Sequence, residues 1–309
     1  MRVLVMAAGS VGGYFGGVLA KGGNEVKFVA RNENLAQIKA NGLVVQSATT
    51  GSFVVESADA VDSLDGDWQA DLVLFCVKSY HNEVAIEQMK PAIGPNTTIL
   101  TLQNGLGSAD ELSATFGEDA VMLGAAYVEA ERLSPGVFAE HGGTCRLVFG
   151  ERDGSWSERG LNILKTFNGA GIEGILSDDV SATLWTKLVF ISALSGITCI
   201  CRSSMVEALG NPSTADLTLR ILEETTNVGR AAGVIIPTDM AQTTMAQFQR
   251  DKADLVSSMH MDLMAGRPLE LANINGAVAA IGKLHGVATP VNDFITSCLS
   301  VAHNRATQT

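Results

Sequence analysis

The sequence predicts an α/β protein in which a doubly wound parallel sheet is followed by an all-helical second half. Three observations predict it: short β-branched runs alternate with helical patterns in the first half, a glycine-rich turn follows the first run, and strand alternation stops after about residue 177. Strands separated by helices form parallel sheets. We therefore expect a Rossmann-type domain over 1–176 and a helical domain over 177–309.

The first half opens with strands at 2–7 (RVLVMA) and 25–30 (EVKFVA). Between them, residues 11–22 predict a helix with small residues facing the sheet. The later elements of this half follow in order: a helix over 34–42 closed by Gly42, a hairpin over 43–47 and 52–57, a buried strand within 70–78, a helix within 85–93, a strand within 97–105, and strands within 119–142 and 144–151.

The second half shows apolar residues at helical spacing. Its first helix is expected within 177–198, where Asp178 and Asp179 are acids suited to a helix start. A long helix is predicted over 213–233, with glycine at its end. Further helical segments are predicted within 240–266 and 268–286. We expect the pair Glu223–Glu224 on a solvated helix face.

Composition narrows the classes of function. The formal net charge of −12 and the pI of about 4.8 disfavour binding to nucleic acid or to an anionic membrane. The most apolar stretch, 188–201, is about 14 residues long and short of the roughly 20 that span a bilayer. The five cysteines show no C-x-x-C pair, and the five histidines show no metal spacing. We expect a cytoplasmic protein with buried free thiols and no bound metal.

The glycine turn lies within 3–20 (VLVMAAGSVGGYFGGVLA). A dinucleotide-binding turn has the spacing G-x-G-x-x-G, and here only the second and third glycines are present. We expect the first position to be tolerated if the alanine there keeps a negative φ. A tight structural turn and a nucleotide site both fit this stretch. For the second case the cofactor-binding residues are Ala7, Gly9, Ser10, Val11 and Gly12.

Arg31 stands where the second strand ends, 19 residues after Gly12. A protein specific for NAD usually carries Asp or Glu here, on the ribose hydroxyls. An arginine suits the additional 2′-phosphate of NADP, because its planar fork matches phosphate oxygens. NADP is therefore favoured, although a surface arginine is the simple alternative and Glu33 leaves NAD open.

Four further stretches carry a family resemblance. They are LFCVKSYH (74–81), LTLQNGLGSADEL (100–112), ATLWTKLVFISALSGITCI (182–200) and SSMHMDLMAGRPLELANING (257–276). With the glycine turn and Arg31, their order resembles the ketopantoate reductase family (2-dehydropantoate 2-reductases) over nearly the whole chain. The resemblance implies a Rossmann domain joined to a helical domain. It also implies NADPH-dependent reduction of 2-dehydropantoate to (R)-pantoate, on the way to pantothenate and coenzyme A.

The resemblance also implies roles for individual residues. Lys187 matches the catalytic lysine of the family, and Glu270 matches its glutamate. Ser258 matches the substrate-binding serine. Asn104 matches the asparagine that ends a strand beside both substrate and cofactor, and Lys78 matches the cofactor lysine that ends the preceding strand.

The chemistry of these residues supports the match independently. Hydride addition to a ketone places negative charge on the carbonyl oxygen, so a proton donor there lowers the barrier. A lysine on an apolar helix is partly desolvated, which lowers its pKa towards a range useful for proton transfer. We expect Pro268 to open a helix with Glu270 in its first turn. Simple alternatives remain: Lys187 reaching solvent, Glu270 complementing a helix dipole, Ser258 as a surface hydroxyl and Asn104 as a turn former.

The sequence also departs from the family pattern. Members commonly carry asparagines four and eight residues after the lysine, lining the substrate pocket, where this chain has Ile191 and Ser195; another asparagine is replaced by Leu255. Because amides that bind a hydroxyl discriminate strongly, a bulkier or less hydroxylated keto acid becomes an alternative substrate. A β-hydroxy acid or imine dehydrogenase and a non-catalytic NADPH-binding regulator also fit the sequence. We expect Lys187 to face a nicotinamide in a cleft between the two domains, and a homodimer is compatible with the sequence.

Overall fold

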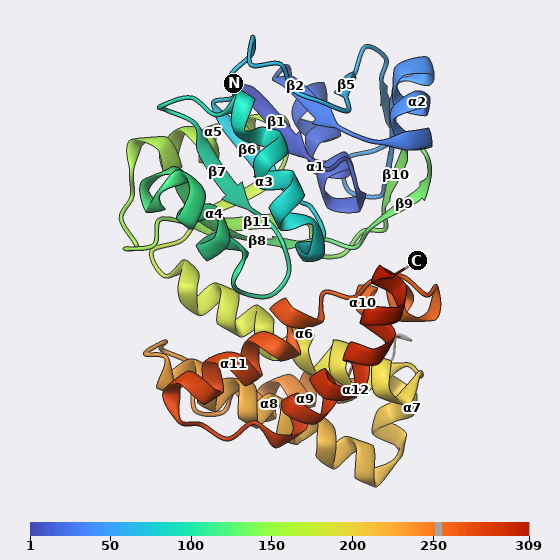
Figure 1. Cartoon of the computed structure of the whole chain (residues 1–309), viewed down its shortest axis with the longest axis vertical. Helices are drawn as coiled ribbons and strands as arrows, with labels where there is room; N and C mark the ends of the chain where they lie inside the picture. The colour runs from blue at the N-terminus through green and yellow to red at the C-terminus, as the bar shows by residue number, and fades with distance from the viewer. Residues whose placement is uncertain (251–254, 309) are drawn as a thin grey trace. The chain divides into compact units, whose positions relative to one another are not determined.

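The computed structural model describes residues 1–250 and 255–308. The chain divides into two compact units, an N-terminal unit of Met1–Gln103 and Ser108–Val180 and a helical unit of Asn104–Gly107 and Ser181–Thr309 (Figure 1). The α/β class, with a mainly parallel sheet followed by helices, is confirmed. One tetrapeptide from the first half of the chain is part of the helical unit, which the sequence did not predict.

The N-terminal unit is built on an eight-stranded sheet in the order β12-β11-β8-β7-β6-β1-β2-β5. Neighbouring strands are parallel, except that β11 is antiparallel to β8. The strands are β1 (Arg2–Met6), β2 (Glu25–Val29), β5 (Asp59–Val61), β6 (Leu72–Phe75), β7 (Thr98–Thr101), β8 (Val121–Tyr127), β11 (Arg146–Gly150) and β12 (Glu173–Leu176). The central strands β6 and β7 are buried at every residue because both faces of the sheet are covered.

Helices cover the two faces of this sheet in pairs. Side chains of α1 (Ser10–Lys21) and α5 (Glu158–Ala170) share one apolar core with the sheet, whereas α3 (Asn82–Met89) and α4 (Ser108–Phe116) share the core of the opposite face (Figure 1). The helix α2 (Asn32–Asn41) follows β2. Three short 3-10 turns complete the unit: Ser79–His81, Lys90–Ala92 and Glu118–Ala120.

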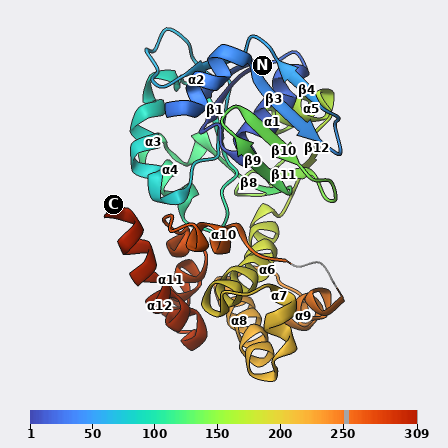
Figure 2. The same cartoon turned by 90° about the vertical axis from the view of Figure 1, so that its right-hand side faces the viewer.

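A second sheet of four strands, in the order β4-β3-β10-β9, packs beside α1 (Figure 2). Its strands are β3 (Leu43–Ser47), β4 (Phe53–Val55), β9 (Ala130–Ser134) and β10 (Val137–Glu140). The predicted hairpin is confirmed, since β3 and β4 are antiparallel. Its pairing with β10, far along the chain, was not predicted.

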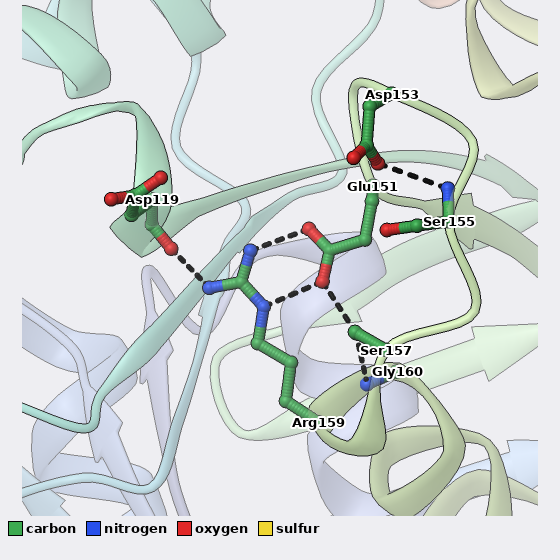
Figure 3. Close-up of polar contacts among 7 residues, drawn as sticks. All are labelled: Asp119, Glu151, Asp153, Ser155, Ser157, Arg159 and Gly160. Atoms are coloured by element: carbon green, nitrogen blue, oxygen red, sulfur yellow. Dashed lines mark hydrogen bonds and ion pairs between the residues drawn. The ribbon is translucent and has the colours of Figure 1, made fainter.

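The start of α5 is fixed by a buried carboxylate (Figure 3). Glu151 is 8% exposed and binds the guanidinium of Arg159 in a two-pronged ion pair, with Nε at 2.7 Å from Oε1. Ser157 also donates to this carboxylate and caps α5 by accepting from the N–H of Gly160 at 3.0 Å. Burial would raise the pKa of Glu151, but the hydrogen bonds from Arg159 and Ser157 outweigh it and the pKa is lowered. Arg159 also donates to the carbonyl of Asp119, so one arginine joins three segments.

The helical unit contains α6 to α12 (Figure 2). They are α6 (Val180–Cys201), α7 (Met205–Gly210), α8 (Pro212–Ala231), α9 (Met240–Arg250), α10 (Ser258–Met264), α11 (Asn275–His285) and α12 (Pro290–Thr307), with a 3-10 turn at Leu271–Asn273. At 22 residues, α6 is long and apolar enough to cross a membrane, and 61% of its most apolar window is buried inside the protein. Its buried side chains form the core of this unit with those of α8, α11 and α12.

Glu224 lies inside the helical unit, so the prediction of a solvated Glu223–Glu224 pair is wrong for this residue. It is 8% exposed, and its carboxylate accepts the backbone N–H groups of Val291 and Asn292 at 2.9 and 3.0 Å. The side-chain amide of Asn292 donates to it at 2.7 Å. Asn275 continues the network by donating to Asn292 Oδ1 at 2.9 Å. These bonds join α8, α11 and α12.

Several boundaries differ from the predicted ones. The helix expected over 213–233 is confirmed as α8, while the segment 240–266 contains two helices, α9 and α10, and its residues 251–254 lie outside the described residues. Within 268–286, helix α11 starts only at Asn275. Six α-helices and strands have no predicted counterpart: β5, α4, α5, β12, α7 and α12.

Candidate functional site

The glycine turn joins β1 to α1, as predicted. Gly9 is the residue before the helix, and no described atom lies within 4 Å of a Cβ built on it. At Gly12 a Cβ would lie 2.3 Å from the Ala7 carbonyl oxygen and 2.8 Å from Val5, so only glycine fits. The first N–H groups of α1, which begins at Ser10 and Val11, point out of the helix N-terminus, as in pyrophosphate sites. A nucleotide therefore fits this turn.

Ala7 has a φ of 70°, so the negative φ that was the condition for tolerating alanine here is not met. The left-handed conformation costs an alanine about 1–2 kcal/mol relative to its ordinary backbone. Alanine therefore occupies a position whose left-handed backbone conformation favours glycine, and the turn keeps this conformation at that cost in free energy. The sequence alone shows the missing glycine but not which backbone conformation the substitute takes.

Arg31 follows β2 and is exposed. Since β1 and β2 are adjacent parallel strands in register, Arg31 and the glycine turn lie at the same edge of the sheet. The Arg31 guanidinium donates to Gln88 Oε1 at 2.7 Å. The pKa of His81 is lowered, mainly by burial and to a smaller extent by the positive charge of Arg31.

Lys78 and Asn104 follow the neighbouring parallel strands β6 and β7, so both start from this same edge. Gln103, beside Asn104, is buried, and its side-chain amide donates to the Val77 carbonyl and to Asn82 Oδ1, each at 2.7 Å. These bonds fix the ends of two strands relative to each other. Gln103 and Asn82 were not predicted to take part.

The tetrapeptide Asn104–Gly107 is bound to the helical unit through Asn273. Leu106 N–H donates to the Asn273 carbonyl at 2.9 Å, and the Asn273 side chain donates back to the Leu106 carbonyl at 2.8 Å. Gly105 has a φ of 84°, and a Cβ on it would lie 1.9 Å from the Asn273 carbonyl oxygen. Asn104 is therefore placed by the helical unit, although it follows a strand of the sheet.

Lys187 lies on α6 and is partly buried. Burial lowers its pKa to about 8, while the negative charge of Glu270 opposes the shift. Glu270 is 4% exposed. The sequence predicted Glu270 in the first turn of a helix, and this is wrong. Glu270 lies directly before the 3-10 turn Leu271–Asn273. The structure thus brings Lys187 and Glu270 together electrostatically, from two elements far apart in sequence.

The remaining predicted substrate residues lie in different surroundings. Ile191 is one turn after Lys187 and partly exposed, whereas Ser195 is buried. Ser258 is exposed at the start of α10, and its neighbour Ser257 caps that helix by accepting from His260 N–H at 2.9 Å. The roles of these three residues stay predictions.

The cysteines are free thiols. Cys199 is buried, but Cys298 is exposed, so the expected burial is wrong for that residue. Over residues 1–250 and 255–308, no group of three or more His, Cys, Asp and Glu side chains is placed to hold a metal ion.

Fold and site together are typical of one class of protein: oxidoreductases that join a Rossmann-type unit with a glycine turn to a helical unit with a lysine of lowered pKa. The family model for ketopantoate reductase PanE/ApbA matches residues 3–154, and the model for its C-terminal part matches residues 179–303. The chain belongs to the ketopantoate reductase family of oxidoreductases.

Individual relatives agree with this assignment. The chain is 31% identical over 296 residues to a 2-dehydropantoate 2-reductase of Halobacterium salinarum, covering 94% of this chain and 95% of that protein. It is 28% identical over 302 residues to the uncharacterized oxidoreductase YkpB of Bacillus subtilis, covering 97% and 98%. The crystal structure of a PanE/ApbA family ketopantoate reductase from Ralstonia eutropha JMP134 superposes with a TM-score of 0.90 at 30% identity, covering 99% of this chain and 100% of that one.

Proposed function

We propose that this chain reduces 2-dehydropantoate to (R)-pantoate with NADPH, a step towards pantothenate and coenzyme A. The observation that carries the proposal is the partly buried Lys187. Burial lowers the pKa of this lysine to about 8, and the negative charge of the neighbouring Glu270 offsets part of that shift. Family membership and the relative named 2-dehydropantoate 2-reductase support the same reaction.

Lys187 is the proton donor in this proposal. A bound nicotinamide would supply a hydride for the substrate carbonyl, and a proton donor of this chain would stabilise the negative charge on the carbonyl oxygen. With a pKa near 8, the Lys187 ammonium holds its proton at neutral pH and still releases it readily to that oxygen. The Glu270 carboxylate stabilises the charged lysine and accepts a hydrogen bond from a substrate hydroxyl. Ser258 and Asn104 contribute further hydrogen bonds to the substrate.

We assign the nucleotide to the N-terminal domain, 1–176, and the substrate groups other than Asn104 to the helical domain, 177–309. The turn Ala7–Gly12 holds the pyrophosphate through free N–H groups of the first turn of α1. Arg31 takes the 2′-phosphate, which favours NADPH over NADH. Lys78 and Asn104, at the ends of the adjacent strands, complete the cofactor site.

A second candidate is the reduction of a different, more apolar 2-keto acid. Ile191 favours it, because this partly exposed side chain lies four residues after Lys187 and therefore on the same face of α6. An apolar side chain at this position offers no hydrogen bond to a substrate hydroxyl. The two candidates differ only in the substrate and share the proton donor and the cofactor.

Steady-state oxidation of NADPH with a panel of 2-keto acids tests the proposal. We expect turnover of 2-dehydropantoate that falls by at least about a thousandfold in Lys187→Ala and is unchanged in Lys165→Ala, an exposed lysine of α5. Turnover of only another 2-keto acid selects the second candidate. NADPH binding without turnover of any panel member would contradict an enzymatic role and identify a binding protein. Turnover of β-hydroxy acids or imines alone would identify a different dehydrogenase.

For the cellular setting, we propose a cytoplasmic enzyme that takes a small-molecule substrate and forms a homodimer. The formal net charge of −12 is unfavourable for nucleic acids and for anionic membrane surfaces. Sedimentation of the purified chain measures its oligomeric state directly.

A further inference from the structure

The side chain of Gln88, which belongs to none of the sequence motifs, contacts the guanidinium of Arg31 just after β2. Gln88, in the last turn of α3 and partly buried, accepts a hydrogen bond from Arg31 Nη2 at 2.7 Å. Its other end donates from Nε2 to the backbone carbonyl of Asp62. Gln88 therefore links an exposed guanidinium to the backbone of a neighbouring strand segment.

The sheet register brings the two partners of Gln88 together. Strands β2 and β5 are parallel and pair up to Val29 and Val61, and Ala30 N–H donates to the Val61 carbonyl at 2.9 Å. Arg31 follows Ala30 and Asp62 follows Val61, so the two residues lie on adjacent segments just after the paired strands. A side chain from α3 can reach both because buried residues of this helix share an apolar cluster with Val29 and Val61.

The amide of Gln88 can take only one orientation in this position. A backbone carbonyl accepts and cannot donate, so the –NH₂ end of Gln88 must face Asp62, and the oxygen must face Arg31. A guanidinium carries five N–H donors, and this bond uses one of them. Most donors of Arg31 therefore stay available to a phosphate, while the position of the guanidinium is restrained in advance of binding.

We propose that Gln88 is a positioning residue that holds Arg31 ready for the 2′-phosphate of the cofactor and thereby sets the preference for NADPH over NADH. The inference rests on the nucleotide site of the proposed function. Gln88 touches neither nicotinamide nor substrate in this scheme, and its effect passes through Arg31 alone. Its loss therefore changes recognition of the one group that distinguishes the two cofactors.

Two substitutions separate positioning from charge. Gln88→Leu removes both hydrogen bonds with little change in volume and leaves Arg31 mobile. Gln88→Glu places a carboxylate beside Arg31, which binds the guanidinium more strongly and repels a phosphate, and the amide donor to Asp62 is lost as well. Asn41→Leu and Asn41→Asp are the matched controls. Asn41 is exposed, donates to Gln37 at 2.7 Å, and lies ten residues after Arg31, about 15 Å along α2.

The experiment titrates the intact chain and its variants with NADPH and with NADH, without substrate, and follows nucleotide fluorescence. We expect Gln88→Leu to weaken NADPH binding about three- to tenfold, the net contribution of one ordinary hydrogen bond, and to leave NADH binding within about twofold. We expect Gln88→Glu to weaken NADPH more than about tenfold and to move the preference towards NADH. Both Asn41 variants should match the unmodified chain.

A double-mutant cycle with Arg31→Gln shows whether Gln88 acts through the arginine. In the Arg31→Gln background, Gln88→Leu should change NADPH affinity by less than about twofold. Equal losses for both cofactors, an unchanged preference, or tighter NADPH binding in Gln88→Leu would each overturn the inference. If the unmodified chain prefers NADPH and turns over a keto acid while Gln88→Leu has no effect, only this inference fails. If the unmodified chain binds neither nucleotide, the proposed function fails with it.

Discussion

Asn292, at the start of α12, gives both its backbone N–H and its side-chain amide to the carboxylate of Glu224, at 3.0 and 2.7 Å. Glu224 belongs to α8, so the first turn of one helix is capped from another. Thr289, the residue before α12, makes no side-chain capping bond to that helix within the described part of the chain. The Glu224 carboxylate replaces that cap and faces the positive end of the α12 dipole.

Replacing Glu224 should therefore destabilise the helical unit. Glu224→Gln keeps the size of the side chain but puts an –NH₂ group against backbone and side-chain donors, leaving buried N–H groups without an acceptor. We expect a loss of about 1–3 kcal/mol in the free energy of unfolding. Urea unfolding of the intact chain measures it. Glu223→Gln, on the adjacent and partly exposed residue, should change it by less than about 0.5 kcal/mol, and equal effects of both variants would contradict the capping role.

The turn at Ala7 predicts a stabilising substitution. With a φ of 70°, Ala7 is in a conformation that glycine adopts without strain. We expect Ala7→Gly to raise the free energy of unfolding by about 0.5–1 kcal/mol, the gain from relieved strain less the added entropy of the unfolded chain. Ala8→Gly is the control and should destabilise, because the buried Ala8 has a packed methyl group to lose. A destabilised Ala7→Gly chain would show that the left-handed conformation carries no strain.

The lowered pKa of Lys187 predicts the pH dependence of reduction. A proton donor must be charged, so the rate should fall as pH rises through about 8, where the lysine deprotonates. Glu270 raises this pKa against the larger effect of burial. In Glu270→Gln the pKa of Lys187 should therefore drop further, and the fall in rate should begin at lower pH. The profile of kcat/KM from pH 5 to 10 measures the shift; an unmoved profile in Glu270→Gln, or a shift in the control Glu223→Gln, would contradict the coupling.

The close approach at Gly105 predicts a position where alanine is not tolerated. A Cβ there would lie 1.9 Å from the Asn273 carbonyl oxygen. We expect Gly105→Ala to destabilise the chain by about 2–4 kcal/mol, since backbone strain is joined by a clash with main-chain atoms. Gly117→Ala isolates the strain: its φ of 85° is nearly the same, and no described atom lies within 4 Å of its Cβ. The difference between the two urea midpoints reports the clash, and equal midpoints would exclude it.

The sequence predicted the parts of this fold that depend on local pattern. The strands β1, β2 and β6 and the helices α1 and α8 follow from runs of apolar residues with a clear period, and the glycine turn marks the junction of β1 and α1. The pairing of β3 with β10 joins residues more than 90 positions apart, which no local period encodes. For the same reason the sequence indicated a carboxylate pair on a helix but not that Glu224 reaches the start of α12.

The candidate site shows the same limit. Lys187 was conspicuous because a charge interrupts an apolar helix, and Arg31 because it stands at a fixed distance from the glycine turn. Gln88 gave no signal, since a glutamine on an amphipathic helix is ordinary until the sheet register places Arg31 and Asp62 beside it. The strain at Ala7 was equally hidden, because composition shows the residue and not its backbone angles.

The tetrapeptide Asn104–Gly107, which belongs to the helical unit, limits how the chain can be divided into fragments. A fragment made by truncation at residue 181 lacks four residues of its own unit, and the Asn273 carbonyl loses the Leu106 N–H that it accepts. In the complementary fragment, Asn104–Gly107 would lose their hydrogen bonds to Asn273, and the positive φ angles of Gly105 and Gly107 would lose that support. Neither half of the gene therefore encodes a self-sufficient module, and chimeras with other enzymes must exchange the tetrapeptide together with the helices.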